Sequence, residues 1–118
     1  GKRKPHMAST DDKNENTVII TQENLKIIEL IKKINSRYDE FEHNNIIINL
    51  NSLKKVSLES LVEFLQLSNN HRANSHSFVI VSKTSDLNAV PDEIVVVPTI
   101  KEAHDIVEME EMERDLGF

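Results

Sequence analysis

Two serines in the middle of the chain are the residues whose type and spacing first raise the question of chemistry. A serine hydroxyl becomes a nucleophile where a positioned base activates it and hydrogen-bond donors stabilise the developing charge. Ser57 and Ser60 lie in the segment V-S-L-E-S-L, which lacks the G-x-S-x-G turn of serine hydrolases. The same segment predicts a helix start, with Ser57 as the N-cap and Glu59 in the first turn. We therefore expect the Ser57 hydroxyl to stabilise a helix.

Histidines and glycines decide whether metal or nucleotide chemistry is expected. His71 and His76 are close in the sequence, but no dense set of ligands surrounds them and the chain has no cysteine. We expect both to be surface histidines. The only glycines are Gly1 and Gly117, whereas a phosphate-binding loop needs several glycines between a strand and a helix. The sequence thus predicts a chain that is not an enzyme and uses no cofactor and no catalytic metal.

The most acidic segment lies in the last part of the chain. Seven acidic residues occur from Glu102 to Asp115. One interpretation is a solvated helix face. The other is a docking surface formed by Glu108, Met109 and Met112, because methionine side chains adapt readily to a partner.

The composition is that of one small globular domain. The chain has 118 residues, of which 38% are hydrophobic and only 4% aromatic, so a single core has to be built from isoleucine, valine and leucine. The first six residues resemble an added tag. We expect residues 1–16 to be a tag remnant followed by a disordered tail, and residues 17–118 to form one domain.

The charge balance bears on the partners. The formal net charge is −6, and without the positive charges of Lys2, Arg3 and Lys4 it becomes −9. A chain this acidic repels nucleic-acid phosphates at long range. No apolar stretch approaches the ~20 residues that a membrane span requires, and no signal peptide is apparent. We expect a cytoplasmic protein that binds neither nucleic acid nor membrane.

Strands and helices are expected to alternate along the chain. Runs of β-branched residues predict strands at 18–20, 46–50, 78–81 and 94–97. Apolar residues at three- and four-residue spacing predict helices from 24 to about 41, from 57 to about 69, and from 99 to about 117. Their apolar stripes include four side chains that we expect to face the core: Ile28, Leu58, Val62 and Met112. The alternation predicts an α/β fold with a single, mainly parallel sheet of four to five strands and three to four packed helices.

Part of the sequence resembles a known family. The stretch from Ile46 to Leu65, I-I-I-N-L-N-S-L-K-K-V-S-L-E-S-L-V-E-F-L, resembles the STAS domain, the module of bacterial anti-sigma-factor antagonists and of sulfate-transporter tails. In that family a strand ending in D-L-S leads through a short turn to D-S-S-G-L at a helix start. The ending V-V-V-P-T-I-K-E-A-H-D-I-V-E-M-E-E-M-E-R-D-L is similar to the last strand and helix of some bacterial members. The resemblance covers Thr17 to Phe118 in element order and implies a STAS-like fold, which usually has a further N-terminal strand.

The resemblance also implies a function. In the family, the first serine of D-S-S-G-L accepts phosphate from a partner kinase, and phosphorylation releases the partner. Here Ser57 replaces the Asp, Leu58 the phosphoacceptor, Glu59 the second Ser and Ser60 the Gly. Since leucine cannot be phosphorylated, the implied protein is a non-catalytic bacterial interaction domain that lacks the usual switch and contacts an anti-sigma kinase-like partner through these four residues. The alternative is an accessory or structural subunit that binds another protein through the acidic C-terminal helix.

Overall fold

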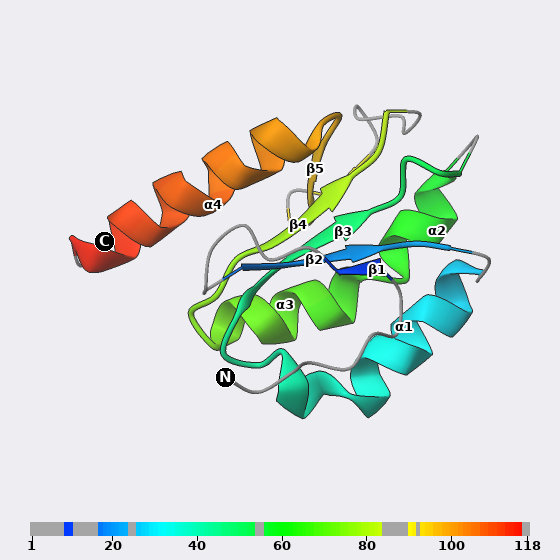
Figure 1. The fold of residues 1–118 in the computed structure, drawn as a ribbon, viewed down its shortest axis with the longest axis horizontal. Coiled ribbons are helices and arrows are strands. Elements are labelled where there is room, and N and C mark those ends of the chain that lie inside the picture. Colours follow the sequence, from blue (N-terminus) through cyan, green and yellow to red (C-terminus); the bar gives the residue numbers. More distant parts are fainter. Residues whose placement is uncertain are drawn as a thin grey trace.

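The chain forms an α/β arrangement of one sheet and flanking helices (Figure 1). The computed structural model describes residues 9–10, 17–23, 26–53, 56–83, 90–91 and 93–116. Its strands are β1 (Ser9–Thr10), β2 (Thr17–Thr21), β3 (Asn45–Asn49), β4 (Phe78–Val81) and β5 (Val95–Val97). Its helices are α1 (Ile27–Ser36), α2 (Leu58–Val62), α3 (Leu65–Ala73) and α4 (Ile100–Asp115), with a 3-10 turn at Tyr38–Glu40. Within these ranges, no helix has both the length and the apolar character needed to cross a bilayer.

The sheet has the strand order β1-β2-β3-β4-β5. Strands β2 to β5 run parallel, whereas β1 pairs antiparallel with β2. The register places Ile20, Ile48, Ile80 and Val96 next to one another across the sheet. Strands β3 and β4 are buried almost throughout, as nearly continuous β-branched runs indicate for a parallel sheet covered on both faces. The predicted α/β fold with a single, mainly parallel sheet is confirmed.

Helices cover the two faces of the sheet unequally. Leu30 of α1 and Leu61 of α2 pack with α3 and Ile48 on one face, in the larger core cluster. On the other face, Ala103 and Val107 of α4 pack on a smaller cluster of strand residues. Figure 1 shows α1, α2 and α3 on one side of the sheet and α4 on the other, with the C-terminal half of α4 extending past the strands.

The first helix is shorter than predicted. Helix α1 ends at Ser36, and the 3-10 turn at Tyr38–Glu40 replaces its expected last turns. The prediction that Ile28 faces the core was wrong, because this side chain is exposed. The buried side of α1 runs instead through Leu30 and Ile34.

Two short helices, α2 and α3, replace the single helix predicted after position 57. The break falls at Glu63 and Phe64, and the Phe64 side chain is fully buried. Because α2 contacts the core through one side only, Leu61 faces inward while Leu58 and Val62 are exposed. The prediction that Leu58 and Val62 belong to the core was therefore wrong.

Helix α4 begins where the sequence predicted. The Oγ1 of Thr99 accepts a hydrogen bond from the N–H of Glu102 at 3.1 Å, which caps the helix. Its buried side consists of Ala103 and Val107. The prediction that Met112 faces the core was wrong, because the last turns of α4 lie beyond the apolar part of the sheet and Met112 points to solvent.

The expected tail contains a strand. Ser9 and Thr10 pair with β2, so the prediction of a disordered tail fails at these two residues. The rest of residues 1–16 and the predicted helix stop at Gly117 lie outside the described residues.

Candidate functional site

The start of α2 lies at the end of the sheet that is formed by the carboxyl ends of the parallel strands. The Oγ of Ser57 accepts a hydrogen bond from the N–H of Ser60 at 3.1 Å and donates one to the Oγ of Ser60 at 3.1 Å. Val56 and Leu61, on either side of this cap, both enter the core, which is the pattern of a hydrophobic staple. The predicted capping role of Ser57 is confirmed. Its hydroxyl is engaged in local bonds, and in the described part of the chain no basic side chain bonds to it.

An apolar pair faces solvent at this helix. Leu58 is 39% exposed and Val62 is 42% exposed, and their four-residue spacing places them on the same side of the helix. Glu59 and Glu63 are exposed beside them. The four contact residues predicted at positions 57–60 therefore lie together at the start of α2. One of them, Leu58, forms the exposed apolar pair with Val62, and the carboxylates of Glu59 and Glu63 lie beside this pair.

Side-chain bonds hold the turns at this end of the sheet. The Nδ2 of Asn51 donates to the carbonyl of Pro98 at 3.4 Å, and the Oδ1 of Asn51 accepts from the N–H of Lys83 at 2.9 Å. The hydroxyl of Ser52 donates to the carbonyl of Gln22 at 2.8 Å. The turn after β3 is thus tied to the residues that follow β2, β4 and β5.

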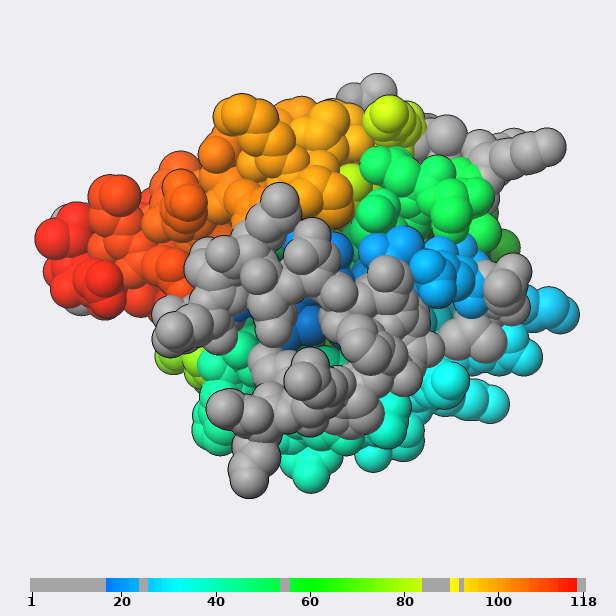
Figure 2. Space-filling model, viewed as in Figure 1, coloured from blue at the N-terminus to red at the C-terminus, as the bar shows by residue number. Residues whose placement is uncertain are grey.

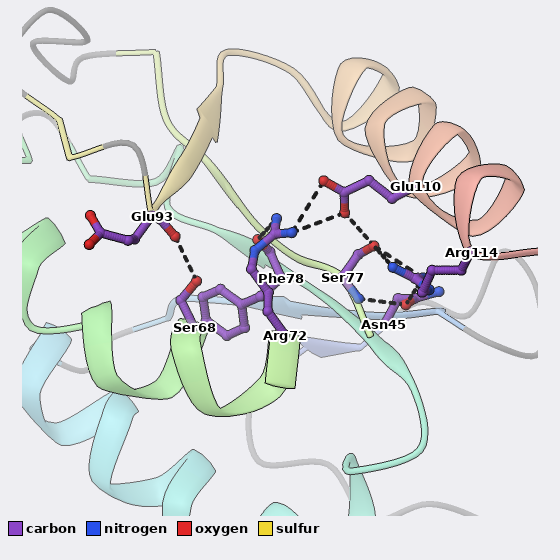
Figure 3. Close-up of polar contacts among 8 residues, drawn as sticks. All are labelled: Asn45, Ser68, Arg72, Ser77, Phe78, Glu93, Glu110 and Arg114. Atoms are coloured by element: carbon purple, nitrogen blue, oxygen red, sulfur yellow. Dashed lines mark hydrogen bonds and ion pairs between the residues drawn. The ribbon is translucent and has the colours of Figure 1, made fainter. Parts of the chain in front are cut away.

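A polar network at the end of the sheet where the parallel strands begin holds the C-terminal half of α4 (Figure 3). The Nη1 of Arg72 in α3 donates to both carboxylate oxygens of Glu110 in α4, at 3.3 and 3.2 Å. Its Nη2 donates to the carbonyl of Phe78 at 3.1 Å, and the hydroxyl of Ser77 donates to Glu110 at 2.6 Å. Because α3 and α4 lie on opposite faces of the sheet, this ion pair passes around the start of β4 and joins the two layers.

The same network reaches β3 and the last turn of α4. The Nη2 of Arg114 donates to the Oδ1 of Asn45 at 3.3 Å and to the Oγ of Ser77 at 3.4 Å. The Nδ2 of Asn45 donates to a carboxylate oxygen of Glu111 at 2.7 Å. Three charged residues of α4, including Glu110, are thereby fixed to the starts of β3 and β4.

This anchoring determines which side of α4 faces solvent. The three residues predicted to dock a partner, Glu108, Met109 and Met112, are all exposed. Met109 is 50% exposed and Met112 is 62% exposed. The acidic residues of α4 therefore fall into two groups, because Glu110 and Glu111 bind within the molecule while Glu108 remains at the surface.

His71 is fully buried, so the prediction of a surface histidine was wrong here. Its Nε2–H donates to the carbonyl of Asn44 at 2.5 Å, and its Nδ1 accepts from the hydroxyl of Tyr38. This is the pattern of a neutral imidazole ring whose proton is on Nε2. Burial lowers the pKa of His71 from 6.5 to about 4, against the opposing effect of the Asn44 hydrogen bond. The ring serves as an internal link between α3 and the 3-10 turn.

A hollow of about 340 Å³ lies beside the polar network and is lined by His43, Asn45, Ser75, His76, Glu111, Arg114 and Asp115. Burial, together with the charge of Arg114, lowers the pKa of His76. In the part of the chain that the structure describes, no hydrogen bond joins Ser75 to a histidine, and no three His, Asp or Glu side chains are grouped to hold a metal ion.

Sequence reasoning missed the network that anchors α4. Arg72 and Glu110 are 38 positions apart, and Arg114 and Asn45 are 69 positions apart. Periodicity and capping rules describe only neighbours within a few residues. The one available signal was the acidic run itself, which did not show that part of it is neutralised internally.

Comparisons with known proteins add no family assignment. No protein-family model and no curated protein matches this sequence. The STAS resemblance therefore stays a prediction, and function has to be argued from the two exposed helical surfaces.

Proposed function

We propose that the chain is a non-catalytic protein-binding domain, a STAS-like module that contacts its partner at the start of α2. The observation that carries this proposal is the exposed pair of Leu58 and Val62 beside Glu59, on a helix held to the core by the buried side chains of Val56 and Leu61. An apolar pair with a polar surround is the usual composition of a protein contact surface. A small interface of this type fits a regulatory interaction.

Two features of the fold support the STAS-like part of the proposal. Helix α2 is the next element after β3 in the chain, which is the order of strand and helix that the family motif spans. Strand β1, antiparallel to β2, occupies the position of an additional N-terminal strand. By resemblance, the partner is an anti-sigma kinase-like protein of the bacterial cytoplasm. Because Leu58 stands in the phosphoacceptor position, this contact would not be released by phosphorylation there.

Site-specific photo-crosslinking tests the proposal. A photoreactive amino acid placed at Leu58 should capture a defined partner, and the same group at Lys32, an exposed residue of α1, serves as the matched control. The additional change Val62→Glu should reduce capture roughly tenfold or more, because it places a charge in the centre of the contact. Equal capture from both positions, or no effect of Val62→Glu, would count against binding at α2. A captured kinase-like protein supports the STAS-like assignment.

A second candidate function is an accessory subunit that binds through α4. The exposure of Met109 and Met112 favours it, because an apolar side chain gains little by facing water on a helix whose other side is already anchored. A photoreactive group at Met109 distinguishes the two candidates, since each predicts capture from its own surface.

A further inference from the structure

The outer side of α4 carries an apolar stripe, which we define as Met109, Met112 and Leu116. Leu116 is 66% exposed, the most among the exposed large apolar side chains of the described residues. The three residues follow at steps of three and four positions, so they line one side of the helix end. Figure 2 shows α4 as a ridge along one side of the molecule, with this end projecting from it.

The α4 stripe lies opposite the anchored side of the helix. Each of its members follows a sheet-facing or network residue by two positions: Met109 follows Val107, Met112 follows Glu110, and Leu116 follows Arg114. Two residues correspond to about 200° around an α-helix. The stripe therefore cannot contact the sheet while the opposite side stays anchored, and folding of this domain leaves it uncovered.

Exposed carboxylates border the α4 stripe. Asp105, Glu108, Glu113 and Asp115 are all exposed. Of these, only Asp105 takes part in an ion pair in the described part of the chain, with Lys101 at 3.4 Å.

The charge of α4 limits the choice of occupant. Over Ile100–Asp115 the helix carries seven acidic and two basic residues. This charge repels anionic lipid and nucleic-acid phosphates, and it opposes pairing of the stripe with a second copy of itself. Basic residues on the partner would instead be attracted to the border.

We propose that the α4 stripe is the docking site for a basic amphipathic helix of another protein. An apolar face of that helix packs on Met109, Met112 and Leu116, and lysine or arginine side chains flanking that face meet the carboxylates of Glu108 and Glu113. Methionine side chains fit this role because their flexible, polarizable thioethers adapt to different apolar surfaces. Recognition of an amphipathic helix through i, i+3 and i+7 anchors is a recurrent mode of peptide binding. The inference deepens the second candidate function by naming the partner class, and it does not depend on the α2 surface.

A synthetic peptide provides the probe. It contains only leucine and lysine, is about 18 residues long, and carries its leucines on one helical face. Two reference peptides have the same composition in scrambled order, or glutamate in place of lysine. Fluorescence anisotropy should show binding of the basic amphipathic peptide, weakening with added salt, and roughly tenfold or more tighter than either reference peptide.

Two double variants locate the contact. Met109→Ser with Met112→Ser should weaken peptide binding roughly tenfold or more, because the central apolar anchors are lost. The matched control, Leu58→Ser with Val62→Ser, removes the exposed pair of α2 and should leave the affinity within about twofold. In the unmodified chain, the ε-methyl NMR signals of Met109 and Met112 should shift on titration, which keeps the test valid if a variant folds poorly.

Several results would overturn the inference. Equal binding of the scrambled peptide would reduce the contact to unspecific charge attraction, and tighter binding of the glutamate peptide would contradict the role of the border. Self-association of the chain that depends on Met109 and Met112 would assign the stripe to a second copy instead. An unchanged affinity of the Met109→Ser, Met112→Ser variant would move the site elsewhere. Absence of peptide binding at α4 would leave the crosslinking prediction at Leu58 unaffected, and absence of crosslinking at Leu58 would leave peptide binding unaffected. The two proposals can therefore be refuted separately.

Discussion

The imidazole of His71 lies in a buried site that favours its neutral form. It bonds to the carbonyl of Asn44 and to the hydroxyl of Tyr38, while the positive charges of Arg72 and Arg114 lie nearby. Protonation would place a charge in a buried site and would add it to an already positive surrounding. The native state therefore resists protonation of this ring.

The lowered pKa predicts a loss of stability in mild acid. In the unfolded chain His71 binds a proton as the pH falls below 6.5, whereas in the folded chain it does so only near the pKa of about 4. Its contribution is therefore fully present above pH 6.5 and is lost as the pH falls toward 4. At pH 5 the loss for this single group amounts to at most about 2 kcal/mol of the free energy of unfolding.

Urea unfolding of the wild type and of His71→Gln at pH 7 and pH 5 checks this prediction. Glutamine can donate and accept like the neutral ring but does not titrate, so the variant should lose less stability between the two pH values. The control is His43→Gln, whose histidine side chain is 87% exposed and whose replacement should leave the pH dependence unchanged. Parallel pH profiles for wild type and His71→Gln would show that His71 does not cause the effect.

The caps were predictable from the sequence and the buried polar contacts were not. Ser57 and Thr99 bond to residues three positions away, which is within the reach of sequence rules. His71 depends on Tyr38, 33 positions away, and a histidine in a polar segment gives no sign that such a partner will bury it.

The apolar contacts of helix α4 with the sheet come from its first half, so a polar anchor holds its second half. Its fully buried side chains are Ala103 and Val107, with Ile100 and Ile106 partly buried beside them. The ion pair of Arg72 with Glu110 lies beyond them, with both side chains largely covered. Removing one partner of such a pair leaves the other without its counter-charge, which costs more than the pair itself contributes.

Glu110→Gln should therefore lower the free energy of unfolding by roughly 1–3 kcal/mol. The matched control is Asp105→Asn, which breaks an exposed pair with Lys101 on the same helix and should change stability by less than about 0.5 kcal/mol. The double variant Arg72→Met, Glu110→Met should recover part of the loss, because no unpaired charge remains. Chemical denaturation measures all three, and an equal effect of Glu110→Gln and Asp105→Asn would refute the role of the anchor.

Helix existence was predictable, and helix interruptions were not. The apolar spacing around Leu61 and Leu65 reads as one continuous helix, yet Phe64 enters the core and breaks it. Such a break depends on the space available between α2, α3 and the sheet, which no local pattern contains. The error had a functional consequence, because it assigned Leu58 and Val62 to the core.

For the molecule as a whole, the alternation of strand and helix patterns correctly predicted an α/β fold. The pairing of β1 and the face on which α4 packs could not be predicted from the sequence. Antiparallel pairing of β1 depends on two residues without a strand-forming pattern. The placement of α4 on the face opposite α1, α2 and α3 depends on the direction in which the chain leaves β5.

The sheet order predicts how protection from hydrogen exchange is distributed. Backbone amides of Ile47, Ile48, Val79 and Ile80 lie in β3 and β4, the strands paired on both sides and covered on both faces. They should exchange slowest, near the limit of global unfolding, whereas amides of Val95 to Val97 in β5 should exchange faster. Two-dimensional NMR after transfer to heavy water measures this order. Equal protection of β4 and β5 would contradict the assignment of β5 as a strand at the sheet edge.

The position of α4 in the chain has a consequence for synthesis on the ribosome. All the strands of the sheet precede α4, yet in the described structure α4 is the helix that covers the face bearing Ile19, Ile47 and Val79. This face remains exposed to solvent until the 16 residues of α4 have been added, which takes about 1–3 s at usual elongation rates. During that interval the nascent chain presents an apolar sheet surface with its other layer already able to form. Addition of α4 is thus the step that covers this face of the sheet, and a chain stalled before it would be prone to aggregate.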